Sequence, residues 1–472
     1  MSKGKSEKVK KNENKPVDPV KESLAILKAI PPPEDPPKKM QFYEAQTDRF
    51  GYAVGSEGYC AYVTNEGLTD MCLSQFTTKF SSELAQRYLG PHATPNGERI
   101  WKDLQAVLHK YLWFHDQRMY PMVATWIMGT YLYQIFSFYG YLLLYSKKTD
   151  RNKSGARCGK SQFLKLNQYL SYEAKPPMNI TTSAAIRDGS AMGQVLQIDT
   201  LDKLEAKGDQ GVQALMDILD GAFGKGGYSE KKVLDDKGNW KTQSYWIYSP
   251  YSMCGIGRDN LEKPAQDRSF IFEMKQKSIT IKKAKMDEKR LLDDTTPIRN
   301  DLYFWGLHNS KAVAKDYRTN PNLISDFELN DRAEDIWRPL FVVLRNLGFK
   351  THSTEWETLK ALAIEMHLNP EVKEREEQLK MFECFRSHDS YKGTTTDMVK
   401  YLAERGIERT AKQILVMMEE HSVPKKSLRL KGRKPFKGFE LTPKILDDIM
   451  DSLTHIYSET DDYNDYRAVG EH

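Results

Sequence analysis

The sequence predicts an α/β protein with a parallel sheet at its centre and a smaller helical region later in the chain. Short apolar runs at 141–145 and 195–198 are typical of strands buried in a parallel sheet. The first run leads into a small-residue loop and then into Gly159-Lys160-Ser161 at the start of a helix. The third observation lies near the C-terminus, where three helix candidates precede a basic hairpin.

The composition is ordinary for a globular intracellular protein. The chain has 472 residues, enough for two to four domains, with 39% hydrophobic and 29% charged residues. Its net charge of +5 comes mainly from residues 1–40, where ten Lys outweigh six Asp and Glu. Any basic surface on the remainder must therefore be local. The five cysteines are scattered without a Cys-x-x-Cys pair, which predicts a reducing, cytoplasmic location without a zinc site.

One stretch imitates a membrane span. Residues 119–146 contain no charged side chain, and this length is enough to cross a bilayer. Pro121, Gln134 and several tyrosines weaken its apolar character. We therefore expect a buried helix over 121–136 and a central strand over 141–145, because both elements are apolar on all sides when buried. No membrane association is predicted.

Changes in composition divide the chain into six segments, with a Lys- and Pro-rich tail at the start and an acidic tail at the end. Apolar residues at helical spacing predict a helix from about Asn96 and another over 325–348. The expected segments are a disordered tail (1–40), an unassigned N-terminal region (41–116), the core with both apolar strands (117–290), a helical lid or connector (291–374), a basic helical domain (375–457) and an acidic tail (458–472).

The loop before the first predicted helix of the core has the composition of a phosphate-binding loop. Small residues let backbone N–H groups turn toward an anion, and the helix N-terminus adds its positive dipole end. We expect Lys160 to contact the terminal phosphates of ATP and the Ser161 hydroxyl to ligate Mg²⁺. The usual first glycine is replaced by Ser154, so a chance Gly-Lys-Ser on a surface is the alternative. The expected nucleotide-binding residues are Gly155, Cys158, Gly159, Lys160 and Ser161.

A second acidic ligand for Mg²⁺ is expected at the end of a neighbouring strand. Asp199 ends the run 195–198 and fits this role, although a strand-end Asp also caps turns. The next position usually carries a Glu that orients the attacking water, but here it is Thr200. Thr200 can position water without acting as a base, and Asp202 or Glu205 is a possible substitute. Hydrolysis is therefore less firmly predicted than binding.

A third element contains an arginine ahead of another strand. Residues 248–257 predict a strand and a glycine-containing turn, and Asp267-Arg268 precedes a strand at 269–274. In ring ATPases, an arginine in this place often contacts the nucleotide of the neighbouring subunit. The alternative is a surface salt bridge between Asp267 and Arg268. Arg332, farther along, is a candidate lid arginine or the partner of a neighbouring acid.

Together these stretches resemble a family of helicase-like P-loop ATPase domains, still classed as of unknown function, that lie C-terminal to primase–polymerase modules of phages and mobile elements. The resemblance covers about 117–450 and implies an AAA+/RecA-like P-loop core. Three departures are a longer insertion at 147–153, Thr200 in place of Glu, and no primase–polymerase module before the core. The matching motifs are 124–127, 130–131, 157–161, 179–187, 198–199, 255–257, 267–269 and 331–340.

The C-terminal domain supplies an independent indication of DNA contact. Helix candidates at 375–387, 396–405 and 410–421, with Thr396 as N-cap and Gly406 as stop, precede a hairpin in a winged-helix-like pattern. Segment 424–438 holds seven Lys and Arg and no acid, which suits contacts to the DNA backbone. The alternatives are a solvated hairpin or a docking surface for an acidic protein. The expected DNA-binding residues are Lys425, Lys426, Arg429, Lys431, Arg433, Lys434 and Lys437.

The leading hypothesis is an ATP-binding and ATP-hydrolysing, helicase-like motor or loader that forms a homo-oligomer, for example a ring, and acts on DNA in the replication of a phage, plasmid or mobile element. The biology comes from the resemblance, and the chemistry from Lys160, Ser161, Asp199 and the basic hairpin. The alternative is a nucleotide-gated DNA-binding or assembly protein with little turnover, for which Thr200 is the motive. A third reading is an antiphage defence component.

Overall fold

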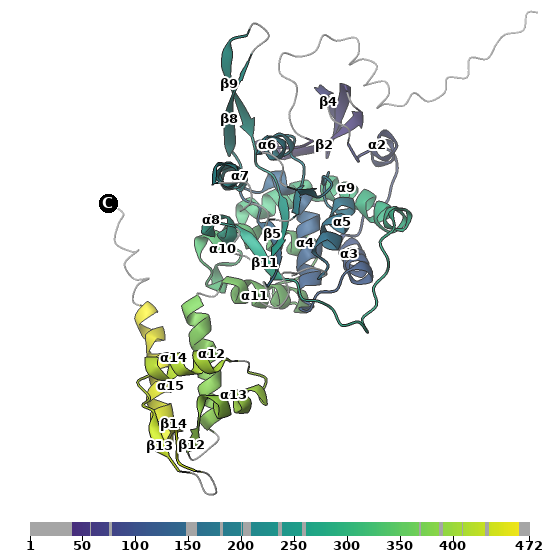
Figure 1. The fold of residues 1–472 in the computed structure, drawn as a ribbon. Coiled ribbons are helices and arrows are strands. Elements are labelled where there is room, and N and C mark those ends of the chain that lie inside the picture. The colour runs from purple at the N-terminus through teal and green to yellow at the C-terminus, as the bar shows by residue number, and fades with distance from the viewer. Residues whose placement is uncertain are drawn as a thin grey trace, which may run out of the picture. The chain divides into compact units, whose positions relative to one another are not determined.

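The computed structural model describes residues 40–56, 58–74, 78–147, 158–179, 183–199, 201, 209–234, 238–256, 261–367, 370–386, 390–407, 409–429 and 434–461. They form two compact units: unit 1 extends to His367 and unit 2 comprises the rest (Figure 1). The predictions for Gly155, Thr200, Lys431 and Arg433 lie outside the described residues. Among the helices that are described, none is long and apolar enough to cross a membrane.

A five-stranded parallel sheet lies at the centre of unit 1. Both runs predicted as strands are part of it and are buried along most of their length, which explains their apolar sequences. The predicted α/β class is therefore confirmed, and the core is consistent with a Rossmann-like or P-loop-like fold. In spatial order the strands are β11 (Ser269–Glu273), β5 (Tyr141–Ser146), β10 (Tyr251–Ile256), β7 (Leu196–Asp199) and β6 (Met178–Asn179).

Helices surround this sheet (Figure 1). The helix predicted from about Asn96 is α3, and the Asn96 side chain caps it by accepting a hydrogen bond from the Arg99 N–H at 2.9 Å. The helices of unit 1 are α2 (Ser82–Leu89), α3 (Gly97–Tyr111), α4 (Met119–Thr130), α5 (Lys160–Leu170), α6 (Ser183–Ala191), α7 (Asp209–Ala222), α8 (Lys263–Asp267), α9 (Glu288–Thr319), α10 (Asp331–Asn346) and α11 (Thr354–His367), with 3₁₀ turns η1 (Tyr133–Ile135) and η4 (Ser325–Phe327).

Two predicted helices are shorter in the structure. The helix expected over 121–136 ends at Thr130, because the buried Gln41 side chain bonds both the Thr130 carbonyl (3.3 Å) and the Gln134 N–H (3.1 Å) in place of further helical bonds. The helix expected over 325–348 begins only at Asp331. Glu328 has a left-handed φ of 55°, and Asn330 caps the new start. The burial of α4 confirms its assignment to the core.

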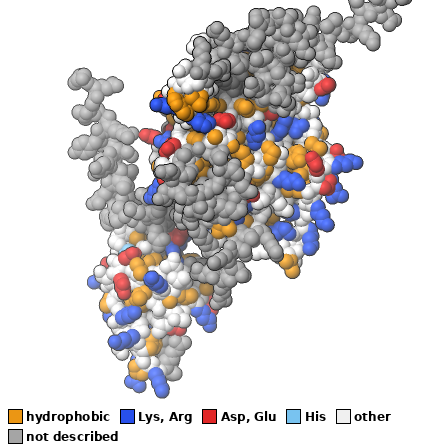
Figure 2. Space-filling model, turned by 45° about the horizontal axis from the view of Figure 1, so that its top comes forward, with side chains coloured by type: hydrophobic (Ala, Val, Ile, Leu, Met, Phe, Trp, Pro, Cys, Tyr) orange, Lys and Arg blue, Asp and Glu red, His pale blue; other side chains and the backbone are white. Residues whose placement is uncertain are grey.

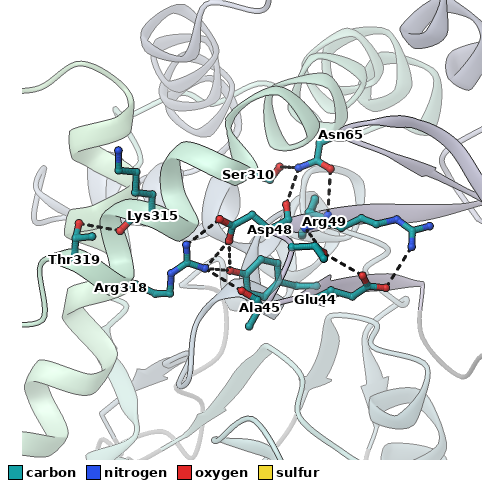
Figure 3. Close-up of polar contacts among 12 residues, drawn as sticks. Glu44, Ala45, Asp48, Arg49, Asn65, Ser310, Lys315, Arg318 and Thr319 are labelled. Atoms are coloured by element: carbon teal, nitrogen blue, oxygen red, sulfur yellow. Dashed lines mark hydrogen bonds and ion pairs between the residues drawn. The ribbon is translucent and has the colours of Figure 1, made fainter.

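The N-terminal region without an assigned role, 41–116, begins with an antiparallel sheet that packs in unit 1 and continues with α2 and α3. Its strands follow the order β1-β2-β3-β4, and they are β1 (Gln41–Glu44), β2 (Arg49–Ser56), β3 (Gly58–Thr64) and β4 (Gly67–Ser74). Arg318 of α9 bonds Asp48 beside β2 in a two-pronged ion pair, and Asn65 donates to the Ser310 hydroxyl at 3.0 Å (Figure 3). These contacts join the antiparallel sheet to the longest helix of the unit.

A two-stranded hairpin projects from unit 1 (Figure 1). It pairs β8 (Tyr228–Leu234) with β9 (Trp240–Trp246). Its register places Tyr228 opposite Trp246 and Leu234 opposite Trp240 on one face of the ribbon. All four of these side chains are at least half exposed.

Unit 2 contains the expected helices and basic hairpin. Strand β14 pairs with both β12 and β13. The first N-cap of the pair of short helices is Thr394 rather than the predicted Thr396, because Thr394 and Asp397 form a capping box. Gly406 ends the turn after this helix with a φ of 78°. The elements are α12 (Pro370–Arg386), β12 (Tyr391–Gly393), α13 (Thr395–Ala403), α14 (Ala411–Glu420), β13 (Lys426–Leu428), β14 (Phe436–Leu441) and α15 (Pro443–Asp461).

Candidate nucleotide site at the carboxyl edge of the sheet

The carboxyl ends of the parallel strands meet at one edge of the sheet, which we call the carboxyl edge. β5 ends there at Ser146 and β7 at Asp199, with β10 between these two strands. Helix α5 begins near this edge at Lys160. Ser146, Lys160 and Asp199 lie apart in the sequence, and the fold brings them to the carboxyl edge.

The Lys160 side chain turns back toward the end of β5. Its ammonium donates to the Ser146 hydroxyl at 2.6 Å and lies 3.4 Å from the Cys158 sulfur. Ser146 is buried, so this contact holds the amine next to the loop. Ser146 was missed by the sequence reasoning, although its place directly after an apolar strand and before the loop is a usable signal.

Ser161 and Asp199 are in direct contact. The Ser161 hydroxyl donates to Asp199 Oδ2 at 3.0 Å, across the gap between α5 and β7. Ser161 is exposed and Asp199 is partly exposed. The two residues predicted to hold Mg²⁺ are thus placed side by side by the fold.

Gly159 sets the direction in which the chain enters α5. It is the N-cap residue, with a φ of 96° and without a side-chain cap. L-residues avoid this left-handed conformation, whereas glycine adopts it at no steric cost. A Cβ at this position would find room, since its nearest neighbour is the Met274 Cε at 3.7 Å. Backbone conformation, rather than crowding, is therefore what requires glycine here.

A buried polar network fixes α5 against β7 and β10. The Asn167 amide of α5 donates to Gln197 Oε1 at 3.2 Å and to the Ser252 hydroxyl at 3.1 Å. Asn167 also accepts from the Ser171 hydroxyl at 2.6 Å. Gln197 lies two residues before Asp199 on the same face of β7. This network positions Ser161 relative to Asp199, and sequence reasoning missed it, although polar residues inside apolar strands are a signal.

Cys254 of β10 lies under the start of α5. Its thiol is fully buried and contacts the Lys160 carbonyl oxygen at 3.7 Å. Burial, and next the charge of Asp199, raises the pKa of this thiol well above its ordinary value. Cys254 is therefore a neutral packing residue beneath the loop and not a nucleophile.

Arg268 lies at the opposite edge of the sheet, which we call the amino edge. It directly precedes β11, and its carbonyl accepts from the N–H of Tyr141 at the start of β5. Its guanidinium forms an ion pair with Asp220, not with the adjacent Asp267. Arg268 and Arg332 both lie over the Phe223 ring, at 5.5 and 5.1 Å from its centroid. Neither arginine reaches the carboxyl edge of its own chain.

The basic hairpin of unit 2 presents its cations from β13, β14 and their connection. Lys426 lies 3.8 Å from Glu440, and the Lys425 amine lies over the Phe439 ring at 5.8 Å. Lys425, Arg429, Lys434 and Lys437 are exposed. The hairpin therefore exposes cations that can contact a polyanion. One cation of the hairpin, Lys426, also lies near a carboxylate of the same hairpin, that of Glu440.

The oxygen pair of Ser161 and Asp199 fits a magnesium ion that is bound together with phosphates. Mg²⁺ prefers hard oxygen ligands and takes only one or two from the protein when phosphates and water supply the rest. Within the described part of the chain, no group of three or more His, Cys, Asp or Glu is placed to hold a metal by itself. Lys160 stands next to this pair and can contribute a positive charge to bound phosphates.

Comparisons with known proteins add distant structural likenesses. No family model matches the sequence, and no curated protein matches it. Among solved structures, the chain is similar to the A form of the apo C-terminal region of NrS-1 (CTR, 305–718). The TM-score is 0.25 at 9% identity, over 79% of this chain and 80% of that chain. A likeness this distant assigns no activity, so the function has to be argued from the geometry of the site.

Proposed function

We propose that unit 1 binds ATP with Mg²⁺ at the carboxyl edge and hydrolyses it. The contact between the Ser161 hydroxyl and Asp199, at 3.0 Å, is the observation that carries the proposal. A hydroxyl at the first turn of a helix and a carboxylate at the end of a parallel strand form the metal-binding half of a phosphate-binding loop. Lys160, Gly159 and the N-terminus of α5 form the phosphate-binding half.

The strand order supports the same placement. From β5 the chain proceeds to β6 on one side of the sheet, whereas after β10 it crosses to β11 on the other side of β5. The direction of the connections therefore changes between β5 and β10. Open α/β sheets bind ligands outside the carboxyl ends of their strands at such a switch point. The loop before Lys160 starts from this place.

In this site, Lys160 stabilises charge on the terminal phosphates, and Ser161 with Asp199 holds the metal. The bound Mg²⁺ neutralises charge on the phosphate oxygens. Thr200 follows Asp199 and is proposed to position the attacking water. The resemblance found in the sequence extends this chemistry to a helicase-like motor or loader, a homo-oligomer acting on DNA of a phage, plasmid or mobile element.

Unit 2 is proposed to contact the DNA backbone. The order helix, strand, two helices, then a two-stranded hairpin and a last helix is typical of winged-helix domains. The exposed cations Lys425, Arg429, Lys434 and Lys437 would neutralise phosphates in a salt-dependent manner. Lys431 and Arg433 belong to the same predicted set.

The test is phosphate release from ATP, with and without DNA, by the full chain. Lys160→Ala is expected to reduce the rate on the order of 100-fold, because a charge aimed at the transferred phosphate is lost. Lys165→Ala is the matched control, since Lys165 is an exposed lysine on the same helix and its loss changes the charge equally. Equal rates in all three proteins would contradict hydrolysis at this site.

Thr200 favours one alternative, a nucleotide-gated DNA-binding or assembly protein with little turnover. A Thr lacks the carboxylate that orients and activates water at this position. The alternative predicts tight ATP binding with slow phosphate release, and a gain of about tenfold in Thr200→Glu. An unchanged rate in that variant counts against it. A role in antiphage defence stays a third possibility, which neighbouring genes would separate from replication.

A further inference from the structure

A lysine-rich loop leaves the carboxyl edge beside the candidate nucleotide site. Residues 275–286, called the lysine loop here, connect β11 with α9 and contain five Lys and no Asp or Glu. The preceding residue, Met274, donates its N–H to the carbonyl of Tyr145 in β5 at 2.6 Å. Met274 also lies next to Gly159, so the loop starts directly beside the start of α5.

The far end of the loop is fixed to α3. The Ala284 N–H donates to the Lys110 carbonyl at 2.9 Å, and the Lys283 amine donates to the His109 carbonyl at 2.5 Å. Ala284 and Met286 pack against the hydrophobic core. With both ends held, the lysines between them keep a defined position on unit 1.

The tip of the loop is an ordered turn that displays an isoleucine. The Ile281 N–H donates to the Ser278 carbonyl at 3.1 Å, and the Lys277 amine donates to the Ile281 carbonyl at 2.6 Å. Ile279, within this turn, is 86% exposed. One exposed apolar side chain is ordinary by itself. An apolar tip between cations, however, is a pairing that DNA-binding proteins use to contact both bases and phosphates.

Three of the carboxylates around the loop are engaged by other cations. Glu273 pairs with Lys147 at 3.2 Å, Asp116 with Arg118 at 2.7 Å, and Asp287 with Arg290 at 3.2 Å. The loop itself contains no carboxylate, so its charged side chains are all cationic. Lys and Arg side chains gather along one margin of this unit with few acids among them (Figure 2).

We propose that the lysine loop is a second DNA-binding element, on unit 1, in which Lys275, Lys282 and Lys285 contact phosphates and Ile279 packs against bases. These three lysines are exposed. The inference rests on the proposed function, to which it adds a DNA contact attached to the nucleotide site through Met274. Nucleotide and DNA would then be bound by neighbouring parts of unit 1.

The test measures the affinity of the full chain for single-stranded DNA at several salt concentrations. The triple variant Lys275→Ala, Lys282→Ala, Lys285→Ala is expected to reduce the slope of log K against log salt by about 2, since each phosphate contact in a single strand adds about 0.7. The control triple Lys263→Ala, Lys315→Ala, Lys350→Ala removes the same charge from exposed positions elsewhere on unit 1 and should leave the slope unchanged.

A second variant tests the apolar tip. Ile279→Ser should weaken DNA binding about tenfold without changing the salt slope, because the variant loses an apolar contact with the bases but no charge. If the loop serves only solubility, the DNA affinity of this variant will equal that of the wild type. Ile279 is exposed, so the substitution leaves the core untouched.

Failures of the two proposals are distinguishable. If the wild-type chain does not bind DNA, the proposed function fails. If it binds DNA and the lysine-loop triple matches the control triple, only the lysine loop is overturned. Polyglutamate serves as a competitor that distinguishes DNA from an acidic protein as the partner. If polyglutamate competes for the chain as well as DNA of equal total charge does, the inference is also overturned.

Discussion

The two edges of the parallel sheet treat their polar side chains in opposite ways. At the carboxyl edge, Ser161 and Asp199 come from different elements, contact each other and remain open to solvent. At the amino edge, Arg268 is closed against Asp220 and the Phe223 ring, with 15% of its side chain exposed. Polar groups that are held in an internal ion pair support stability, whereas groups that are positioned but open can bind a ligand. The difference predicts where substitutions change activity and where they change stability.

The largest contrast is between one carboxylate on each edge. Asp199→Asn is expected to lower phosphate release on the order of 100-fold or more, because a metal ligand is lost, with little change in the free energy of unfolding. Asp220→Asn is expected to lower the free energy of unfolding by about 1–3 kcal/mol, since it weakens the ion pair of a largely buried arginine. Phosphate release and chemical denaturation measure the two effects.

The contrast breaks if the two variants exchange their effects. Loss of phosphate release in Asp220→Asn at unchanged stability would mean that the amino edge takes part in the chemistry. That result would favour the sequence prediction that Arg268 contacts the nucleotide of a neighbouring subunit, which stays a prediction for an oligomer.

The buried network below the carboxyl edge links stability to binding. Asn167→Leu keeps the volume of the side chain but leaves Gln197 and Ser252 with fewer partners, and we expect a loss of about 2–3 kcal/mol in the free energy of unfolding. ATP affinity should fall as well, because α5 is no longer held against β7. Ser171→Ala removes a single hydroxyl from the same network and should cost about 1 kcal/mol. Unchanged ATP affinity in Asn167→Leu would show that the network is not needed for positioning.

Lys79 contacts the other end of α5, and its pKa makes the free energy of unfolding depend on pH. Its amine donates to the carbonyls of Gln168 (2.7 Å) and Ala174 (2.9 Å). Burial lowers its pKa to about 8, so between that value and the pKa of the unfolded chain, about 10.4, the unfolded state binds more protons. Stability from this group therefore rises with pH across that window and is constant below it.

The measurement for Lys79 is chemical denaturation at pH 8 and at pH 9.5. The wild-type free energy of unfolding should increase by about 2 kcal/mol relative to that of Lys79→Met over this interval. Parallel pH profiles of the two proteins would contradict a lowered pKa for Lys79.

A small effect is also expected at Gly159. Gly159→Ala places a side chain on a residue with a φ of 96°, which costs about 1–2 kcal/mol. ATP affinity should decrease in parallel, because relief of this strain would turn the first N–H groups of α5. Gly348→Ala, at a φ of 99° after α10, carries the same strain away from the site and should lower stability alone.

Much of the fold is readable from the sequence, because continuous apolar runs leave few alternatives for buried strands. Asn96 and the basic hairpin were found by their local signals. The end of α4 at Thr130 was not, since it depends on Gln41, which lies 89 residues earlier in the chain. Thr394 was missed as N-cap in a run of three threonines, where only the partner Asp397 selects the capping residue.

The residues of the candidate site also divide into those that the sequence predicts and those that it does not. Lys160, Ser161 and Asp199 follow from motif and spacing, and the fold brings Ser161 and Asp199 into contact. Ser146, Gln197 and Ser252 are marked as polar residues in or at the end of apolar strands. Their partners, Lys160 and Asn167, could not be predicted, because tertiary packing makes these contacts. The partner of Arg268 was missed for the same reason: Asp220 lies 48 residues away in sequence, while Asp267 is adjacent.

The most direct test of the magnesium and nucleotide site is calorimetric titration of ATP with and without Mg²⁺. We predict that the wild-type chain and the control Ser244→Ala, which changes an exposed serine of β9, bind ATP at least about tenfold more tightly with Mg²⁺ than without it. Ser161→Ala should bind ATP with similar affinity in both conditions, because Lys160 and α5 remain while a metal ligand is lost. If Ser161→Ala keeps the full Mg²⁺ dependence, or if the wild type binds no ATP, the assignment of the carboxyl edge is wrong.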